Sequence, residues 1–139
     1  MVQKLNKIIV QETVNLRILL TELEEQHRCI IVSDIFGMEA CVNKIKEANK
    51  NIAQMEVERR KLTQNRAMSS IIEEASDLEL ESNYNKIKNI LQEIVLQKDT
   101  NDLLIRQGLS FTNRILKVLN PARETATYNS CGKVKNSMR

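Results

Sequence analysis

The stretch DTNDLLIRQGLSFTNRILKVLN, residues 99–120, decides the fold and carries the main functional signal of this chain. Successive residues turn about 100° around a helix axis, so its apolar side chains form two neighbouring stripes that together span about 180°. Packing on one side of a small domain needs roughly 100°. We therefore expect one stripe to enter the protein's own core and the other to be left for a partner or a second copy. The first stripe is Leu104, Phe111, Ile115 and Val118, the second is Ile105, Leu109 and Leu116, and Leu119 lies between them.

The composition predicts an all-α protein. Among 139 residues there are three Gly and one Pro, whereas Leu, Ile, Lys, Glu, Asn and Gln are abundant, which is typical of long helices. Aromatic residues make up 3% of the chain and Trp is absent, so the core must be built from Leu, Ile, Val and Met, as in helical bundles. A chain of this length supports a single domain.

Two long helices are predicted in the first half of the chain. Apolar residues recur at steps of three and four over residues 3–32 and again over about 38–65. Residues 33–37, SDIFG, break the pattern, because Ser and Asp favour the N-cap and Gly is a poor residue inside a helix. A short connection favours antiparallel neighbours, so we expect a hairpin about 45 Å long. Polar residues interrupt its seam at Glu12, Gln26, Asn49 and Arg59.

A short connector and a third long helix follow. Within the connector, Ser70–Glu73 and Ser76–Glu79 each have the spacing of a capping box and offer a helix start. The third helix is expected to begin within residues 77–84 and to continue to Asn120, where Pro121 stops it. The small and polar residues beyond it lack apolar periodicity, which predicts no fixed structure when the chain is alone.

The fold prediction is an antiparallel three-helix bundle with a flexible C-terminal tail. The bundle, a long helical hairpin plus a long C-terminal helix, is expected to form the domain of residues 1–120. The tail is expected to comprise residues 121–139.

Two residues inside the third helix do not fit a simple core helix. Asn101 interrupts the apolar run, and a polar residue on a helix seam commonly fixes register or oligomer state, although a direct contact with a ligand is the alternative. Gly108 costs a helix about 1 kcal/mol relative to Ala, which indicates a close backbone approach or a bend.

Charge is placed unevenly along the chain. The formal net charge is +3 at pH 7, yet residues 103–139 hold seven basic residues and one acidic residue, so the preceding part is net acidic. A basic end can meet nucleic acid, an anionic membrane or an acidic protein surface, or can simply be solvated. The spacing matches no basic region or helix-turn-helix motif, so we expect no nucleic-acid partner.

The cysteines and the apolar runs indicate the compartment. Cys29, Cys41 and Cys131 are odd in number and lack zinc-site spacing, which favours free thiols in a reducing compartment. Cys29 and Cys41 are expected near each other beside the hairpin turn, packed as small apolar groups. No run approaches the roughly 18 apolar residues of a spanning helix, and no signal-peptide core is present. We expect a cytosolic protein without stable membrane insertion.

The sequence offers little for catalysis. His27 is the only histidine, and beside Glu24 and Arg28 it is expected to be an exposed polar residue. No phosphate-binding loop, nucleophile elbow or metal-binding motif occurs. We predict no enzyme, no cofactor and no metal.

The surplus apolar stripe suits packing against another amphipathic helix. Two alternatives stay open from periodicity alone. In one, this face closes the monomer's own bundle or a homodimer. In the other, the chain is a structural coiled-coil oligomer or adaptor whose strip is a permanent interface.

Three features of the sequence define a family resemblance. An Asn precedes a Leu-Leu pair and spaced leucines in residues 101–119, a lone Tyr and a Gly follow at Tyr128 and Gly132, and an ERRKL run closes the second helix at Glu58–Leu62. With the three-helix plan, these features make the chain similar to FlgN-type flagellar export chaperones.

This resemblance implies a cytosolic chaperone that binds hook-associated (hook-filament junction) proteins, shields their helical termini and escorts them to the flagellar type III export gate. It implies a monomer or weak homodimer, and it makes the basic tail and Tyr128 candidates for contact with the export apparatus. The alternative is that the tail is an arm that becomes ordered when it binds the client. The expected partner-binding residues are Asn101, Ile105, Leu109, Thr112, Leu116, Leu119 and Tyr128.

Overall fold

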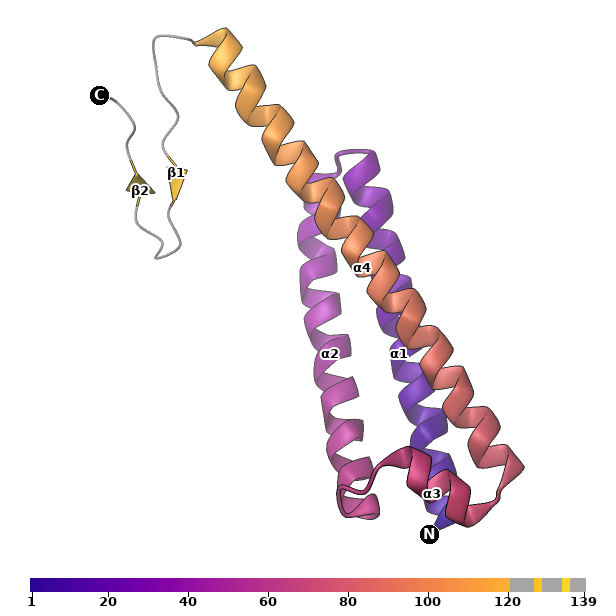
Figure 1. The fold of residues 1–139 in the computed structure, drawn as a ribbon. Coiled ribbons are helices and arrows are strands. Elements are labelled where there is room, and N and C mark those ends of the chain that lie inside the picture. Colours follow the sequence, from indigo (N-terminus) through magenta and orange to yellow (C-terminus); the bar gives the residue numbers. More distant parts are fainter. Residues whose placement is uncertain (121–126, 129–133, 136–139) are drawn as a thin grey trace. The chain divides into compact units, whose positions relative to one another are not determined.

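The structure, a computed structural model, describes residues 1–120, 127–128 and 134–135. Long helices account for nearly all of this part of the chain, which confirms the all-α prediction. Figure 1 shows the elements in chain order. Their bounds are α1 Val2–Ile31, α2 Ile35–Thr63, α3 Met68–Ala75, α4 Leu78–Leu119, β1 Thr127–Tyr128 and β2 Val134–Lys135.

The chain divides into two compact units, Met1–Asn101 and Asp102–Arg139. The division falls inside α4, so this helix contributes to both units. The predicted boundary at residue 121 rests on a change in amino-acid composition. The division into compact units rests on contacts within the structure, so it does not test that boundary. That boundary stays a prediction.

The first unit is the predicted antiparallel three-helix bundle. α1 and α2 pack side by side as a hairpin (Figure 1). Within this unit α4 runs parallel to α1, because Asn83 bonds to Asn6 near the start of α1 and Asn101 bonds to Leu23 further along it. The short α3 is the predicted connector, and it lies at the end of the bundle at which α1 begins and α2 ends, before α4 starts.

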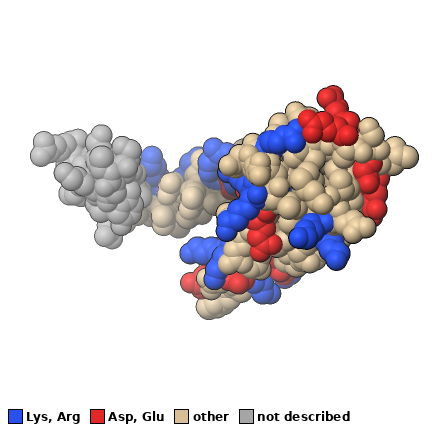
Figure 2. All heavy atoms as spheres, turned by 90° about the horizontal axis from the view of Figure 1, so that it is seen from below, with Lys and Arg blue, Asp and Glu red and all other residues tan. Residues whose placement is uncertain are grey.

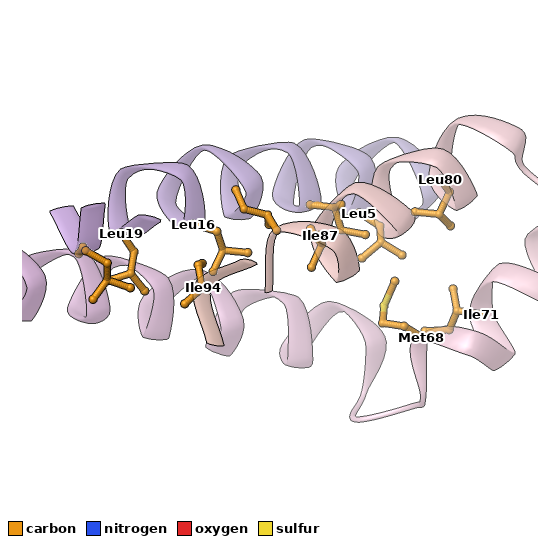
Figure 3. Packing of buried hydrophobic residues seen from close by; sticks show 12 residues of the cluster. Leu5, Leu16, Leu19, Met68, Ile71, Leu80, Ile87 and Ile94 are labelled. Atoms are coloured by element: carbon orange, nitrogen blue, oxygen red, sulfur yellow. The ribbon is translucent and has the colours of Figure 1, made fainter. Parts of the chain in front are cut away.

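The core lies between α1 and α4 and is closed at one end by α3 (Figure 3). α2 supplies fewer buried side chains, mainly Ala48, with Ile45 and Ile52 packed half-buried against the cluster. Burial of each large apolar side chain contributes roughly 1.5–3 kcal/mol, so this cluster is the main source of stability. Its other large members are Leu5, Ile9, Leu16, Leu19, Leu23, Met68, Ile71, Leu80, Ile87, Ile90 and Ile94.

Two of the polar residues that interrupt the hairpin seam meet across it. Arg59 Nε donates to Glu12 Oε1 at 2.9 Å, and both side chains are largely shielded from water. Burial raises the pKa of the Glu12 carboxyl; Arg59 reduces this effect without cancelling it, and Glu56 adds to it. The pair joins α1 to α2, and ionisation of Glu12 is less favourable in the folded protein than in water even with Arg59 beside it.

The hairpin turn is capped as the sequence predicts, but α2 starts earlier than expected. Asp34 is the N-cap, and its Oδ1 accepts the backbone N–H of Gly37 at 2.9 Å. Because this cap satisfies a first-turn donor, the helix begins at Ile35 rather than near Met38. Gly37 lies in the first turn, and a Cβ added there would come within 2.6 Å of Cys29 Sγ.

The helix starts predicted in the connector are only partly right. α3 begins at Met68 without a side-chain cap, so Ser70 lies inside the helix and the predicted start there is wrong. Ser76 ends α3 in the left-handed conformation, with φ of 49°. Asp77 instead caps the start of α4, because its Oδ1 accepts the backbone N–H of Leu80 at 2.9 Å. The carboxylate one residue later thus takes the role expected of Ser76.

The second unit contains the last part of α4 and two short strands. α4 ends at Leu119, one residue before the predicted end at Asn120. β1 and β2 pair antiparallel, with Thr127 opposite Lys135 and Tyr128 opposite Val134. For the rest of residues 121–139, the predicted flexibility lies outside the described residues, as does Cys131.

Candidate partner-binding surface

The part of α4 after Asn101 exposes most of its apolar side chains. Every residue from Arg106 to Asn120 is exposed, and Leu104 and Ile105 are half-buried. In the second stripe, Leu109 and Leu116 are 61% and 48% exposed, and Leu119, between the two stripes, is 75% exposed. We call the eight apolar residues of the two stripes the apolar helix face: Leu104, Ile105, Leu109, Phe111, Ile115, Leu116, Val118 and Leu119.

The expectation that one stripe enters the core is wrong for most of the first stripe. Phe111, Ile115 and Val118 are exposed, and only Leu104 is half-buried. The apolar core cluster has no member after Ile94, and Asn101 is the last buried residue of α4. The core therefore ends before the apolar pattern does, and the uncovered apolar surface is larger than the sequence predicted.

Asn101 forms part of the bundle rather than of the exposed face. Its side chain is 1% exposed. Nδ2 donates to Leu23 O at 2.8 Å and to Gln26 Oε1 at 3.0 Å, and Oδ1 accepts from Gln97 Nε2 at 3.0 Å. All its polar atoms are thus bonded within the first unit, which favours the register role over contact with a partner. We leave Asn101 out of the candidate surface.

His27 belongs to the same polar layer. Its Nδ1 lies 2.9 Å from Gln97 Nε2, and the ring is half-buried, so the expectation of an exposed histidine is wrong. The reason is that α4 packs on the side of α1 that carries His27. At the other end of this helix pair, Asn83 Nδ2 donates to Asn6 Oδ1 at 3.1 Å. Polar bonds at both ends therefore set the register of α1 against α4.

The remaining predicted site residues differ in what they present. Thr112 is exposed, and its hydroxyl donates to Gly108 O at 3.0 Å, within its own helix. Gly108 has open space where a Cβ would stand, so no close backbone approach explains this glycine. Tyr128 lies in β1, opposite Val134. Because the hydroxyl of Thr112 is bonded within its own helix, this side chain adds only a methyl group beside the apolar helix face.

Charged side chains share this part of α4 with the apolar residues. Arg106, Arg114 and Lys117 are exposed, and Arg106 Nε contacts Asp102 O at 3.4 Å. In the last turn, Lys117 lies near the negative end of the helix dipole. The surface is therefore apolar with basic groups around it, which suits an amphipathic segment that carries acidic residues.

Other kinds of site find little support in the described part of the chain. No group of three His, Cys, Asp or Glu residues there is placed to hold a metal ion. The helices described include none with both the length and the apolar character needed to cross a membrane. Figure 2 shows one face of the molecule, on which Lys and Arg alternate with Asp and Glu rather than forming one basic patch.

A helical bundle whose longest helix carries an uncovered apolar face defines a class of protein, namely a small all-α protein with a surface suited to packing against another helix. The chain belongs to the FlgN family, because the family model described as "FlgN protein" matches residues 1–136. This is a family of flagellar chaperones. No curated protein and no solved structure matches the chain significantly.

Proposed function

We propose that this protein is a flagellar type III export chaperone that binds hook-associated (hook-filament junction) proteins in the cytosol and delivers them for secretion. The family assignment supports a flagellar chaperone. The single observation that carries the proposal further is the exposed apolar helix face of α4. A chaperone needs such a surface before its client arrives.

The chemistry of the client follows from this surface. A protein whose terminal helices form coiled coils after export carries an amphipathic segment that must be shielded beforehand. The apolar helix face can bury that segment in the helix-in-groove manner. Burial of four or five aliphatic side chains contributes roughly 1.5–3 kcal/mol each before ordering costs, which is sufficient for a micromolar or tighter complex.

The basic tail is the proposed contact with the export apparatus. Residues 121–139 hold four basic residues and one acidic residue, together with Tyr128. An acidic surface on the apparatus would attract such a segment, and a tyrosine supplies an apolar ring with a polar tip for a specific contact. Client and apparatus would then be held by different parts of the chain.

The test is a pair of charge substitutions in the second stripe. Leu109→Asp/Leu116→Asp places two carboxylates on the apolar helix face, so binding of a hook-associated protein should fall at least 100-fold in isothermal titration, with helicity retained. Val14→Asp/Ile18→Asp is the matched control, because these α1 residues are also about half exposed, at 44% and 48%. Loss of the fold in the Leu109/Leu116 variant, or unchanged affinity, would refute the proposal.

A second pair distinguishes the two stripes. Phe111→Asp/Ile115→Asp changes two residues of the first stripe that are exposed as well. If the client covers the whole apolar helix face, both variants lose binding. If it covers the second stripe alone, the Phe111/Ile115 variant keeps affinity within about threefold.

The alternative function is a structural coiled-coil homo-oligomer. The same exposed face favours it, because a permanent interface would cover this apolar surface equally well. Analytical ultracentrifugation separates the two proposals. A chaperone sediments as a monomer or weak dimer and forms a heterocomplex with its client, whereas a structural oligomer stays in one larger assembly and ignores the client.

A further inference from the structure

The end of the hairpin between α1 and α2 carries a solvent-exposed patch made of large apolar side chains. Four large side chains are exposed there, and Phe36 is 85% exposed. They belong to the last turn of α1, the turn itself and the first turn of α2. We call this patch the hairpin tip: Ile31, Val32, Ile35 and Phe36.

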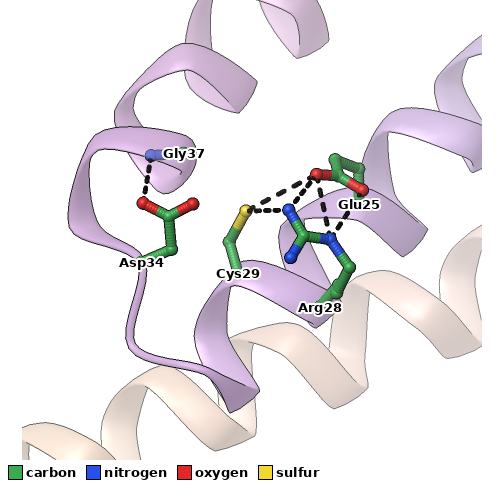
Figure 4. Close-up of polar contacts among 5 residues, drawn as sticks. All are labelled: Glu25, Arg28, Cys29, Asp34 and Gly37. Carbon is green, nitrogen blue, oxygen red and sulfur yellow. Dashed lines mark hydrogen bonds and ion pairs between the residues drawn. The ribbon is translucent and has the colours of Figure 1, made fainter.

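The backbone beneath the hairpin tip is held firmly by hydrogen bonds. Asp34 N donates to Cys29 O at 2.9 Å, and Ser33 N donates to Ile30 O at 3.2 Å. Figure 4 shows Asp34 capping Gly37 and, beside this cap, Cys29 Sγ in contact with Glu25 and Arg28. A fixed backbone loses little conformational entropy on binding, so the tip is preorganised to insert into a partner.

The charge around the hairpin tip is acidic. Within residues 22–44 the acidic residues are Glu22, Glu24, Glu25, Asp34 and Glu39, whereas the basic ones are Arg28 and Lys44, and the charge of Lys44 acts on Glu25. Arg28 is also engaged by Glu25, at 2.6 Å between Nη2 and Oε1, and this bond lowers the pKa of the Glu25 carboxyl (Figure 4). An anionic membrane would repel this end of the hairpin, because membrane-binding loops rely on Lys and Arg.

The size of the hairpin tip also limits what covers it. A stable interface buries about 800 Å² per partner, and even a large aromatic side chain supplies only about 150–250 Å². One largely exposed Phe and three smaller aliphatic side chains fall short of that area. Two tips would in addition bring acidic groups together, so a stable tip-to-tip dimer is disfavoured.

We propose that the hairpin tip is a transient docking site for a folded protein that offers a concave apolar pocket with a basic rim. Ile35 and Phe36 fill the pocket, while Glu24 and Glu39, both exposed, face the rim. This inference does not depend on the identity of the proposed client, because it concerns a different part of the chain from the apolar helix face.

The first experiment identifies the partner in cells. A photo-crosslinking benzoylphenylalanine replaces Phe36 in the full chain, and the control carries it at Val57, which is also exposed on α2. We expect a covalent adduct with one other protein from position 36 and none from position 57. No adduct, an adduct with lipid, or an adduct only with a second copy of this chain would overturn the proposal.

The second experiment measures the contact with purified proteins. The cross-linked protein is titrated with the parent chain, with Ile35→Ser/Phe36→Ser and with the control Val14→Ser/Ile18→Ser. We expect the tip variant to bind at least tenfold more weakly, the control to bind within twofold of the parent, and both to melt within about 3 °C of it. The parent's affinity should also fall as salt rises. Equal affinities for the tip variant and the control would overturn the proposal.

Discussion

At the scale of single residues, the two described glycines have opposite roles. A Cβ at Gly37 would lie 2.5 Å from Asp34 Oδ2 and 2.6 Å from Cys29 Sγ, whereas a Cβ at Gly108 would meet nothing within 4 Å. Gly37 therefore permits the close packing of the hairpin turn. Gly108 is a helix residue without a packing reason, so only its cost in helix propensity remains.

This contrast predicts stability changes of opposite sign. Gly37→Ala should destabilise the protein by about 1–2 kcal/mol, because the added methyl group is overpacked against Cys29 and the cap. Gly108→Ala should stabilise α4 by about 0.5–1 kcal/mol through helix propensity alone. Urea unfolding measures both. A gain in stability for Gly37→Ala would mean that the turn can relax.

Asn101 predicts a separation between stability and binding. Asn101→Ala removes three hydrogen bonds from a buried layer, so the free energy of unfolding should fall by about 1–3 kcal/mol. Client affinity of the folded variant should be unchanged, because the side chain is not exposed. The converse result, intact stability with weakened client binding, would restore Asn101 as a contact residue.

Glu12 predicts a specific pH dependence. Its pKa is raised in the folded protein, so between the unfolded and the folded pKa the folded state binds more protons, and its stability falls as pH rises through that window. Glu12→Gln mimics the protonated carboxyl. The variant should be at least as stable as the parent at pH 7 and should lose this part of the pH dependence, measured by urea unfolding between pH 4 and pH 7. A marked loss of stability at pH 7 would show instead that the ionised pair is net favourable.

At the scale of helices, apolar periodicity predicted the elements well because each helix is long and strongly patterned. Periodicity failed where a single side chain determines the residue at which a helix starts. Asp34 caps α2 early enough to include Ile35 and Phe36 in the helix, and this cap makes the hairpin tip possible. Ser70 had the right spacing for a cap but lies inside α3. The meeting of Glu12 and Arg59 also needed the register of the hairpin, which periodicity does not give.

The candidate site was only partly predictable for a related reason. The 180° apolar arc of α4 predicts surplus apolar surface, but periodicity does not say where along a helix the core stops. The structure places the last core residue of α4 at Ile94, so both stripes beyond Asn101 are exposed apart from the half-buried Leu104 and Ile105. Asn101 marks this change, and its polar side chain was the available signal.

The tail after α4 carries a further prediction. Deletion of residues 121–139 should leave the melting temperature and client affinity unchanged, because the core cluster lies within residues 5–94. Secretion of the client in cells should fall if the tail contacts the export apparatus. Secretion at the parental level by the truncated chain would remove the case for Tyr128 and the basic tail.

At the scale of the whole molecule, the core and the proposed binding surface lie in different parts of the chain. The core cluster is confined to the first unit, whereas the apolar helix face lies in the second. A protein built in this way can expose a large apolar surface without depending on it to fold. Such an arrangement suits a chaperone, whose client must leave without unfolding it.

Hydrogen exchange of the backbone amides in α4, followed with and without a hook-associated protein, tests this arrangement most directly. In the free protein, amides of residues 105–119 should exchange much faster than those of residues 80–101, and the client should slow the exchange of 105–119 selectively. Equal protection of both segments in the free protein, or no effect of the client on residues 105–119, would contradict it.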